Sequence, residues 1–218
     1  MHKKSILIIG AGGIGGLLLD LLCRSISFSD SLQVNISIMD GDVVEERNLP
    51  HQRFSTSDLG KHKVDALNDY LQQLVKAVDN SVMLDPISTN FSEKTALEAF
   101  DLVIVAVDRE EPRQLVHANA TQWLDLRARG DGFVMWSYLD DIQILESLPK
   151  LPKGTSASCQ LDEAIETGNI QFGFALAAAH GAQWVVQWLR GGCLPSGNMY
   201  SIHMGELPMP ESQQGVVE

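Results

Sequence analysis

The glycine-rich segment at residues 10–15 constrains the fold of this chain more than any other sequence feature. It has the pattern GxGxxG, follows the aliphatic residues 5–9 and precedes periodic apolar residues at 15–24. Such a turn needs small residues, because the first glycine allows the tight turn, the second lets main chain approach a phosphate and the third lets helix and strand pack closely. Main-chain N–H groups at the helix start then face an anion. The segment therefore predicts a nucleotide site at Gly10, Gly12, Gly13 and Gly15.

Strands and helices are expected to alternate through the first half of the chain, which gives a parallel sheet with right-handed crossovers. The expected elements are strands over 5–9, 34–39, 82–84, 102–107, 133–138, 142–148 and 199–204, and helices over 15–24, 63–78, 93–100, 113–126 and 172–189. The strands at 133–138 and 142–148 form a predicted hairpin that turns at Asp140 and Asp141.

We therefore expect a single α/β domain over residues 1–218, with a loose tail at 208–218. Its sheet is Rossmann-like and mixed, parallel in the first half and antiparallel in its C-terminal strands, with helices on both faces.

Composition narrows the class of partner and the compartment. A charged share of 20% and an apolar share of 44% are typical of soluble globular proteins. The net charge of −12 disfavours nonspecific binding to nucleic acid. His180, Gln183 and Gln187 interrupt the longest apolar helix, so no membrane span is expected. The three cysteines are widely spaced and fit no disulfide framework, which favours a reducing cytoplasm.

An aspartate ends the second expected strand. At this place a carboxylate accepts hydrogen bonds from ribose hydroxyls, so Asp40 is a candidate ligand for a nucleotide. The alternative is that Asp40 caps a turn with Gly41. The glycine turn and Asp40 do not by themselves distinguish NAD from ATP.

The residues after Asp40 resemble the ThiF/MoeB/HesA family, the ubiquitin-activating-enzyme-like adenylyltransferases. The family pattern is roughly DxDxVxxxNLxRQ, then GxxK, then an aspartate at the end of the fourth strand. The positions that match it are Asp40, Asp42, Val44, Asn48, Leu49, Gln52, Gly60, Lys63 and Asp108. Arg113 follows Asp108 at a spacing that members often show, and residues 173–192 resemble the family's long helix. The resemblance extends over about residues 3–206.

The resemblance implies an activity. Members bring a carboxylate, usually the C-terminal glycine of a small ubiquitin-like protein, to the α-phosphate of ATP, form an acyl-adenylate and expel pyrophosphate. ATP and Mg²⁺ are therefore the implied cofactors. A small ubiquitin-like or sulfur-carrier protein, or a peptide, is the implied partner, and a homodimer is the implied assembly. Because negative charge accumulates on the triphosphate, fixed cations and Mg²⁺ should dominate catalysis.

The same resemblance assigns roles to single residues. Lys63 is implied as a phosphate cation and Asp108 as the Mg²⁺ ligand. Asp42 and Asn48 are implied at the adenosine and phosphate end, and Gln52 at the reacting centre. Each has a structural alternative: Lys63 as a solvated helix residue, Asp108 as a helix cap, and Asn48 as a turn residue.

Two positions depart from the family pattern. His51 stands where members usually have arginine, and Arg53 is the candidate to supply the missing charge; Arg109 replaces the usual asparagine after Asp108. Histidine is mostly neutral at pH 7 and lacks arginine's forked contact to phosphate. These departures keep a second interpretation open, a non-catalytic nucleotide-binding subunit that docks a partner. A third, an NAD-dependent oxidoreductase, depends only on the glycine turn and Asp40.

Cys159 is the candidate nucleophile of a thioester step. Members that form a thioester use a cysteine on the crossover loop before the long helix, where Cys159 lies. Leu161, Ala164 and Ile165 predict a short helix beginning beside it, and a helix N-terminus would lower the pKa of the thiol. The alternative is a small loop residue or a core cysteine.

Overall fold

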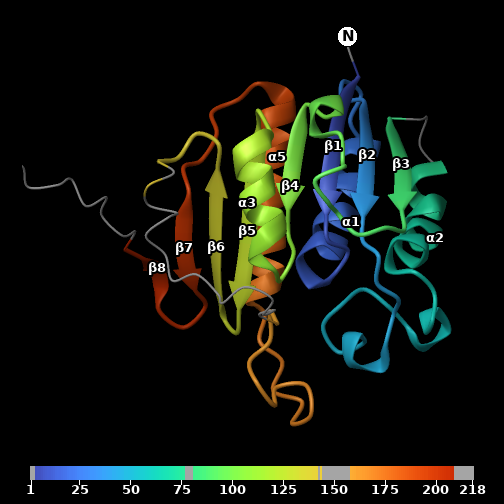
Figure 1. The fold of residues 1–218 in the computed structure, drawn as a ribbon, viewed down its shortest axis with the longest axis vertical. Coiled ribbons are helices and arrows are strands. Elements are labelled where there is room, and N and C mark those ends of the chain that lie inside the picture. Colours follow the sequence, from blue (N-terminus) through green and yellow to red (C-terminus); the bar gives the residue numbers. More distant parts are fainter. Residues whose placement is uncertain (1–2, 77–80, 142, 144–157, 209–218) are drawn as a thin grey trace, which may run out of the picture.

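One eight-stranded sheet runs through the protein, for which the computed structural model describes residues 3–76, 81–141, 143 and 158–208 (Figure 1). The strands lie in the order β3-β2-β1-β4-β5-β6-β7-β8. Their bounds are β1 Lys4–Ile9, β2 Val34–Met39, β3 Val82–Ile87, β4 Leu102–Val105, β5 Trp123–Arg129, β6 Gly132–Ser137, β7 Asn198–Ser201 and β8 Gly205–Leu207. All pairs among β1–β5 are parallel. The pairs β5–β6, β6–β7 and β7–β8 are antiparallel. The predicted mixed sheet is confirmed.

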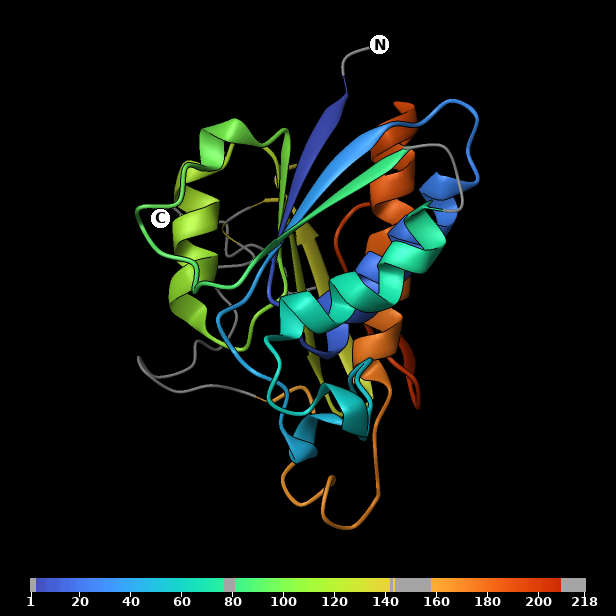
Figure 2. The same ribbon diagram turned by 90° about the vertical axis from the view of Figure 1, so that its right-hand side faces the viewer.

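Helices cover both faces of this sheet. Figure 2 shows α1 (Gly13–Ser27), α2 (Lys63–Lys76) and α5 (Gly173–Arg190) on one face and α3 (Glu110–Asn119) on the other. In β1, Ile6 and Ile8 belong to the core under the three helices, whereas Leu7 and Ile9 belong to the core on the α3 side. Alternate residues of a strand point to opposite faces, so a wholly apolar strand supplies both cores.

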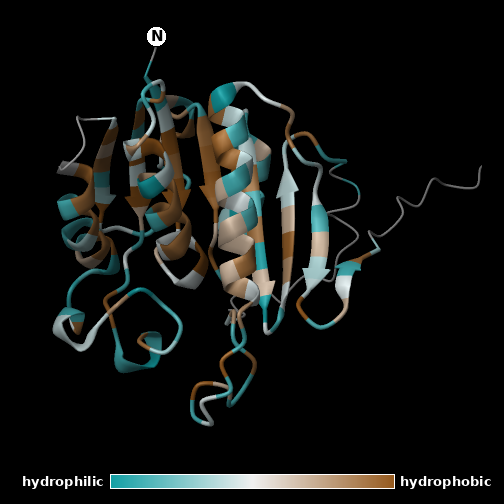
Figure 3. Ribbon diagram, turned by 180° about the vertical axis from the view of Figure 1, so that it is seen from behind, coloured by the Kyte–Doolittle hydropathy of each residue, from teal (hydrophilic) through white to brown (hydrophobic). Residues whose placement is uncertain are grey.

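The character of the strands changes across the sheet. Figure 3 shows apolar residues along the central parallel strands and a mixture of polar and apolar residues toward the C-terminal edge. All four residues of β4 are buried, while β8 has none that is fully buried. The central parallel strands are therefore more completely covered by the rest of the protein than the C-terminal edge strand is.

One predicted helix was wrong in its second half. The expectation was a helix over 113–126, but α3 ends at Asn119 and Trp123 begins β5. Residues 123–126 are all buried, in a strand between two others, and this tertiary setting overrides the local helical pattern. The hairpin partner of β6 is therefore β5, joined through Gly130 with a φ of 61°. The strand predicted at 142–148 lies outside the described residues, apart from Gln143.

Other boundaries also differ from expectation. The helix predicted over 93–100 is reduced to a 3₁₀ turn at Leu97–Ala99. The strand predicted over 199–204 ends at Ser201 with β7; residues 202–204 form a turn, and β8 follows it. The tail lies outside the described residues after Pro208. Within the described part of the chain, no helix has the length and apolarity that a membrane crossing requires.

Candidate functional site

The candidate residues gather at the carboxyl ends of three neighbouring strands. The glycine turn follows β1, Asp40 follows β2, and Asp108 lies between β4 and α3. Because β1 lies between β2 and β4, the chain leaves β1 at the point where the strand order reverses. Ligands of open α/β sheets bind at this switch point.

The glycine turn is sterically required. Gly10 has a φ of +102°, and a Cβ on Gly15 would lie 1.8 Å from the carbonyl oxygen of Gly10. Gly12 is the N-cap of α1 and makes no side-chain capping hydrogen bond. The main-chain N–H groups in the first turn of this 15-residue helix therefore have no side-chain cap from Gly12, and free N–H groups at a helix start are suited to an anion.

Asp40 ties the ends of β1 and β2 together. One carboxylate oxygen accepts a hydrogen bond from the main-chain N–H of Ala11 at 2.7 Å, and the other accepts from the N–H of Asp42 at 2.8 Å. A carboxylate oxygen accepts more than one hydrogen bond, so the contacts to Ala11 and Asp42 leave capacity for a ligand hydroxyl. Asp40 therefore acts as a turn residue in this structure and retains the chemistry of a ribose ligand.

A buried lysine faces the same region. Lys63 begins α2 and is only 8% exposed. Its Nζ lies 2.9 Å from Asp42 Oδ2, and its main-chain N–H donates to the carbonyl oxygen of Asp42. The interpretation of Lys63 as a freely solvated residue is therefore wrong. The structure brings together a cation and a carboxylate that the sequence predicted for one site.

Asn48 organises the loop between β2 and α2. It is 7% exposed, and its Oδ1 accepts a hydrogen bond from the main-chain N–H of Glu45 at 2.9 Å. The carbonyl oxygen of Asn48 also accepts the N–H of Gln52 at 2.9 Å. The contacts seen are those of a turn residue that sets the position of Gln52.

His51 and Gln52 lie against the glycine turn. A Cβ on Gly12 would be 3.9 Å from Gln52 Nε2, and one on Gly13 would be 3.3 Å from the His51 carbonyl oxygen. Burial lowers the pKa of His51, and the nearby positive charge of Lys63 lowers it further. The imidazole is therefore neutral at pH 7.

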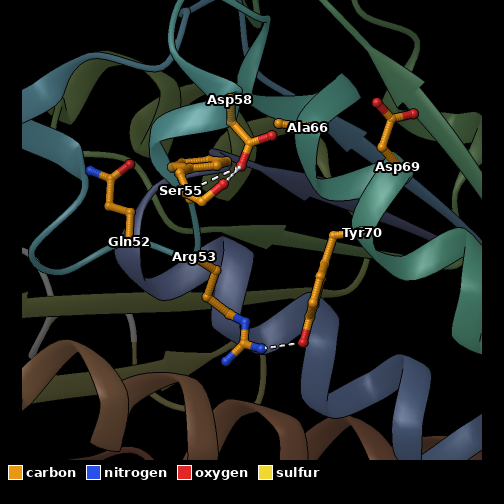
Figure 4. A pocket seen from close by; sticks show the side chains of 8 residues that line it. Gln52, Arg53, Ser55, Asp58, Ala66, Asp69 and Tyr70 are labelled. Atoms are coloured by element: carbon orange, nitrogen blue, oxygen red, sulfur yellow. Dashed lines mark hydrogen bonds between the residues drawn. The ribbon is translucent and has the colours of Figure 1, made fainter.

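Arg53 is held away from this cluster. Its guanidinium lies 3.1 Å from Asp20 Oδ2, donates to the hydroxyl of Tyr70 and stacks 5.0 Å from the centre of that ring. Figure 4 shows Arg53 directed toward Tyr70 and Gln52 pointing away from Arg53, at the rim of an open pocket. The pocket is lined by Gln52, Arg53, Phe54, Ser55, Asp58, Ala66, Asp69 and Tyr70. The structure does not bring Arg53 together with Lys63 and Asp42.

Asp108 is exposed at the end of β4. The N-cap of α3 is Arg109, so the expected alternative role of Asp108 as that cap is not what the structure shows. Arg113 of α3 donates to the carbonyl oxygens of Val107 and Leu126 and pairs with the buried Asp125. This anchor fixes the residue immediately before Asp108.

The carboxylates of the candidate site are better suited to Mg²⁺ than to a metal ion that is bound by protein ligands alone. The described residues contain no group of three or more His, Cys, Asp or Glu that could hold an ion. Mg²⁺ is usually bound by one or two carboxylates plus waters and substrate phosphates. A single exposed carboxylate such as Asp108, near the carboxyl end of β4, is compatible with that mode.

Cys159 is not activated in this structure. Burial raises the pKa of its thiol to about 11, and the negative charge of Asp108 adds to the increase. The short helix predicted beside it is wrong, since residues 162–168 form turns. Without a helix N-terminus the expected lowering of the pKa is missing, and Cys159 is a protonated thiol at neutral pH.

Sequence reasoning missed the part that α5 plays. Phe174, in the first turn of α5, would lie 3.3 Å from a Cβ on Gly13, and its ring meets His51 edge-on. About 160 residues separate Phe174 from Gly13, and an apolar residue at a helix start carries no local signal of such a contact.

Comparison with known proteins places these features in a family. The model of the ThiF family matches residues 1–209. The chain is 34% identical over 119 residues to "Adenylyltransferase and sulfurtransferase MOCS3" of Culex quinquefasciatus, a match that spans 54% of this chain and 25% of that protein. It is 32% identical over 118 residues to "Adenylyltransferase and sulfurtransferase uba4" of Pyricularia oryzae, over 53% and 22% of the two chains. The matches thus span about a quarter of these relatives.

Solved structures share the fold. The structure of E. coli MccB with ATP has a TM-score of 0.63 and 22% identity, and covers 98% of this chain and 66% of its own. The structure of MccB with N-formylated MccA has a TM-score of 0.67 and 20% identity, over 98% and 67%. PaaA has a TM-score of 0.61 and 18% identity, over 95% and 64%.

Proposed function

Because the chain belongs to the ThiF family, we propose that it is an ATP-dependent adenylyltransferase that activates the C-terminal carboxylate of a small carrier protein or peptide. The observation that carries the proposal is the convergence of the glycine turn, Asp40, the Lys63–Asp42 pair and Asp108 at one end of the sheet. The names of the relatives support it, since two are called adenylyltransferases and one neighbour was solved with ATP.

The proposed reaction is an in-line displacement. An oxygen of the acceptor carboxylate attacks the α-phosphorus of ATP, the bond to the bridging oxygen breaks, and pyrophosphate leaves with that oxygen's electrons. The N–H groups at the start of α1 hold phosphate oxygens, and Lys63 turns from Asp42 to neutralise the phosphoryl chain. Asp108 would hold Mg²⁺, which supplies charge neutralisation on the phosphates.

The acceptor is proposed from the relatives. MccB has been solved with MccA, and two relatives are also named sulfurtransferases. A peptide or a sulfur-carrier protein is therefore the proposed substrate class. The proposal does not include a thioester on Cys159, because its thiol is protonated at neutral pH. A homodimer, implied by the resemblance, stays a prediction.

A substitution pair tests the adenylation step. Lys63→Ala should reduce ATP-dependent AMP formation with a synthetic peptide ending in Gly-Gly by about 10²–10³-fold, because one fixed group at developing charge contributes ~3–4 kcal/mol. Lys61→Ala is the matched control, since its exposed ammonium pairs with Asp58 and Asp69 at the surface. Equal activity of the Lys63→Ala and Lys61→Ala variants would contradict the proposal.

A second candidate function has its own observation. Arg53 is engaged by Asp20 and Tyr70, and His51 is neutral, so neither supplies the charge that family members place here. This favours a subunit that binds nucleotide without turning it over. Calorimetry showing stoichiometric ATP binding, with no AMP formed from any Gly-Gly peptide or carrier tested, would support it. Tighter binding of NAD than of ATP would contradict both candidates.

A further inference from the structure

His51 and Gln52 form a buried pair beside the glycine turn. His51 is 8% exposed, and its ring meets that of Phe174 edge-on with 6.2 Å between centroids. Its main-chain oxygen lies 3.3 Å from where a Cβ on Gly13 would stand. The imidazole is therefore fixed between the starts of α1 and α5.

The contact within the pair requires a particular form of the ring. Gln52 Nε2 lies 3.3 Å from His51 Nε2. A carboxamide nitrogen only donates, so in this orientation of Gln52 the facing ring nitrogen accepts and the ring is neutral with its proton on Nδ1. His51 Nδ1 and Gln52 Oε1 are buried and find no partner among the described residues. If the carboxamide is turned over, the pair still keeps one unpaired donor and one unpaired acceptor.

The surroundings favour the neutral ring. Of the elements packed around it, α2 contributes the positive charge of Lys63, which is paired with Asp42, and α5 contributes the apolar Phe174. Burial and the charge of Lys63 both lower the pKa of His51. An arginine at this position would carry a permanent charge, whereas His51 presents a hydrogen-bonding group without one.

We propose that His51 is a positioning residue, whose neutral imidazole holds the Gln52 carboxamide over the Gly12 turn so that Gln52 hydrogen-bonds the acyl group of the bound acceptor. This inference rests on the proposed adenylation function. A protonated ring would set two donors against each other, so the carboxamide would have to turn over or move away. The position of the Gln52 carboxamide therefore changes when His51 gains a proton. An arginine at position 51 would keep its charge and would cause no such change.

The first experiment follows the contact between His51 and Gln52 by NMR and does not depend on enzymatic activity. His51→Gln supplies an acceptor that does not titrate, and His180→Gln is the matched control, because burial also lowers the pKa of that histidine, which packs against Phe133. The NMR signals of the Gln52 side-chain amide should move with the titration of His51 in the wild type and in His180→Gln. They should stay fixed in His51→Gln. Movement that persists in His51→Gln, or that does not follow His51, overturns the proposal.

The second experiment measures recognition of the acyl group. The probes are AMP and glycyl-sulfamoyl-adenosine, a stable mimic of an acyl-adenylate. His51→Phe keeps a ring beside Phe174 but has no ring nitrogen. It should bind the glycyl analogue about tenfold more weakly, the effect of one lost hydrogen bond of ~1.4 kcal/mol, with AMP affinity unchanged. His51→Gln should restore binding of the analogue.

The outcomes separate the two proposals. Equal weakening of AMP and analogue in His51→Phe, or failure of His51→Gln to restore binding, would show a merely structural role for His51. If the wild type binds neither AMP nor ATP, the proposed function fails, while the NMR titration still decides whether His51 sets the position of Gln52. If His51→Phe does not fold, His51→Gln and the NMR titration still decide.

Discussion

At the scale of the residue, two aspartates lie in opposite settings, Asp108 exposed and Asp125 buried. Asp108 is exposed, and as the proposed Mg²⁺ ligand it should be needed for binding rather than for folding. Asp108→Asn should reduce Mg²⁺-dependent ATP affinity by roughly tenfold or more, with unchanged thermal stability. The control is Asp30→Asn, an exposed carboxylate after the far end of α1. Calorimetry with and without Mg²⁺ checks this, and equal affinity of both variants for Mg²⁺-ATP would contradict the assignment.

Asp125 should act on folding. It is 1% exposed and pairs with Arg113 and Arg127, which hold its pKa well below the usual range despite burial. Asp125→Asn leaves Arg113 buried without its partner, and should cost about 3–5 kcal/mol. Exposed Asp69→Asn should cost less than about 1 kcal/mol. Denaturant titration measures both, and similar losses would refute the importance of the buried pair.

Two residues whose pKa values are lowered in the folded protein, Asp125 and His51, also predict how stability changes in acid. Because the folded pKa of Asp125 is depressed, its contribution is present above the unfolded value of ~3.9 and is lost as pH falls further. The pKa of His51 is also lowered, so the unfolded chain binds the proton more readily. Stability should therefore decline as pH falls below ~6.5, and His51→Gln should flatten that part of the curve. An unchanged slope in His51→Gln would contradict this.

At the scale of the element, two glycines of the glycine turn should have different roles, Gly15 in folding and Gly12 in ATP binding. A Cβ on Gly15 would collide with the main chain of Gly10, so Gly15→Ala should lower the melting temperature by several degrees. At Gly12 the nearest atom to an added Cβ is Gln52 Nε2 at 3.9 Å, an ordinary contact. Gly12→Ala should therefore keep the fold and weaken ATP binding, because the Cβ stands where a phosphate approaches. A Gly12→Ala variant that binds ATP normally would count against the phosphate site.

At the scale of the whole molecule, local patterns were enough to predict β1, β2 and β4 but not β5. The glycine turn and aliphatic strands around β1 predicted the sheet, because those signals are local and steric. The β5 strand was missed because burial between β4 and β6 decides it. In the candidate site, the motif named Asp42 and Lys63, and these two residues form an ion pair in the structure. The attachment of Arg53 to Tyr70 and the approach of Phe174 to Gly13 depend on packing between distant segments.

The most direct test is a crystal structure of the protein with Mg²⁺ and AMPCPP, a non-hydrolysable ATP analogue. We expect the phosphates over the N–H groups at the start of α1, Lys63 turned from Asp42 toward them, and Mg²⁺ on Asp108. An analogue bound elsewhere, or phosphates at the turn with Lys63 still on Asp42 and Asp108 without metal, would contradict the triphosphate site.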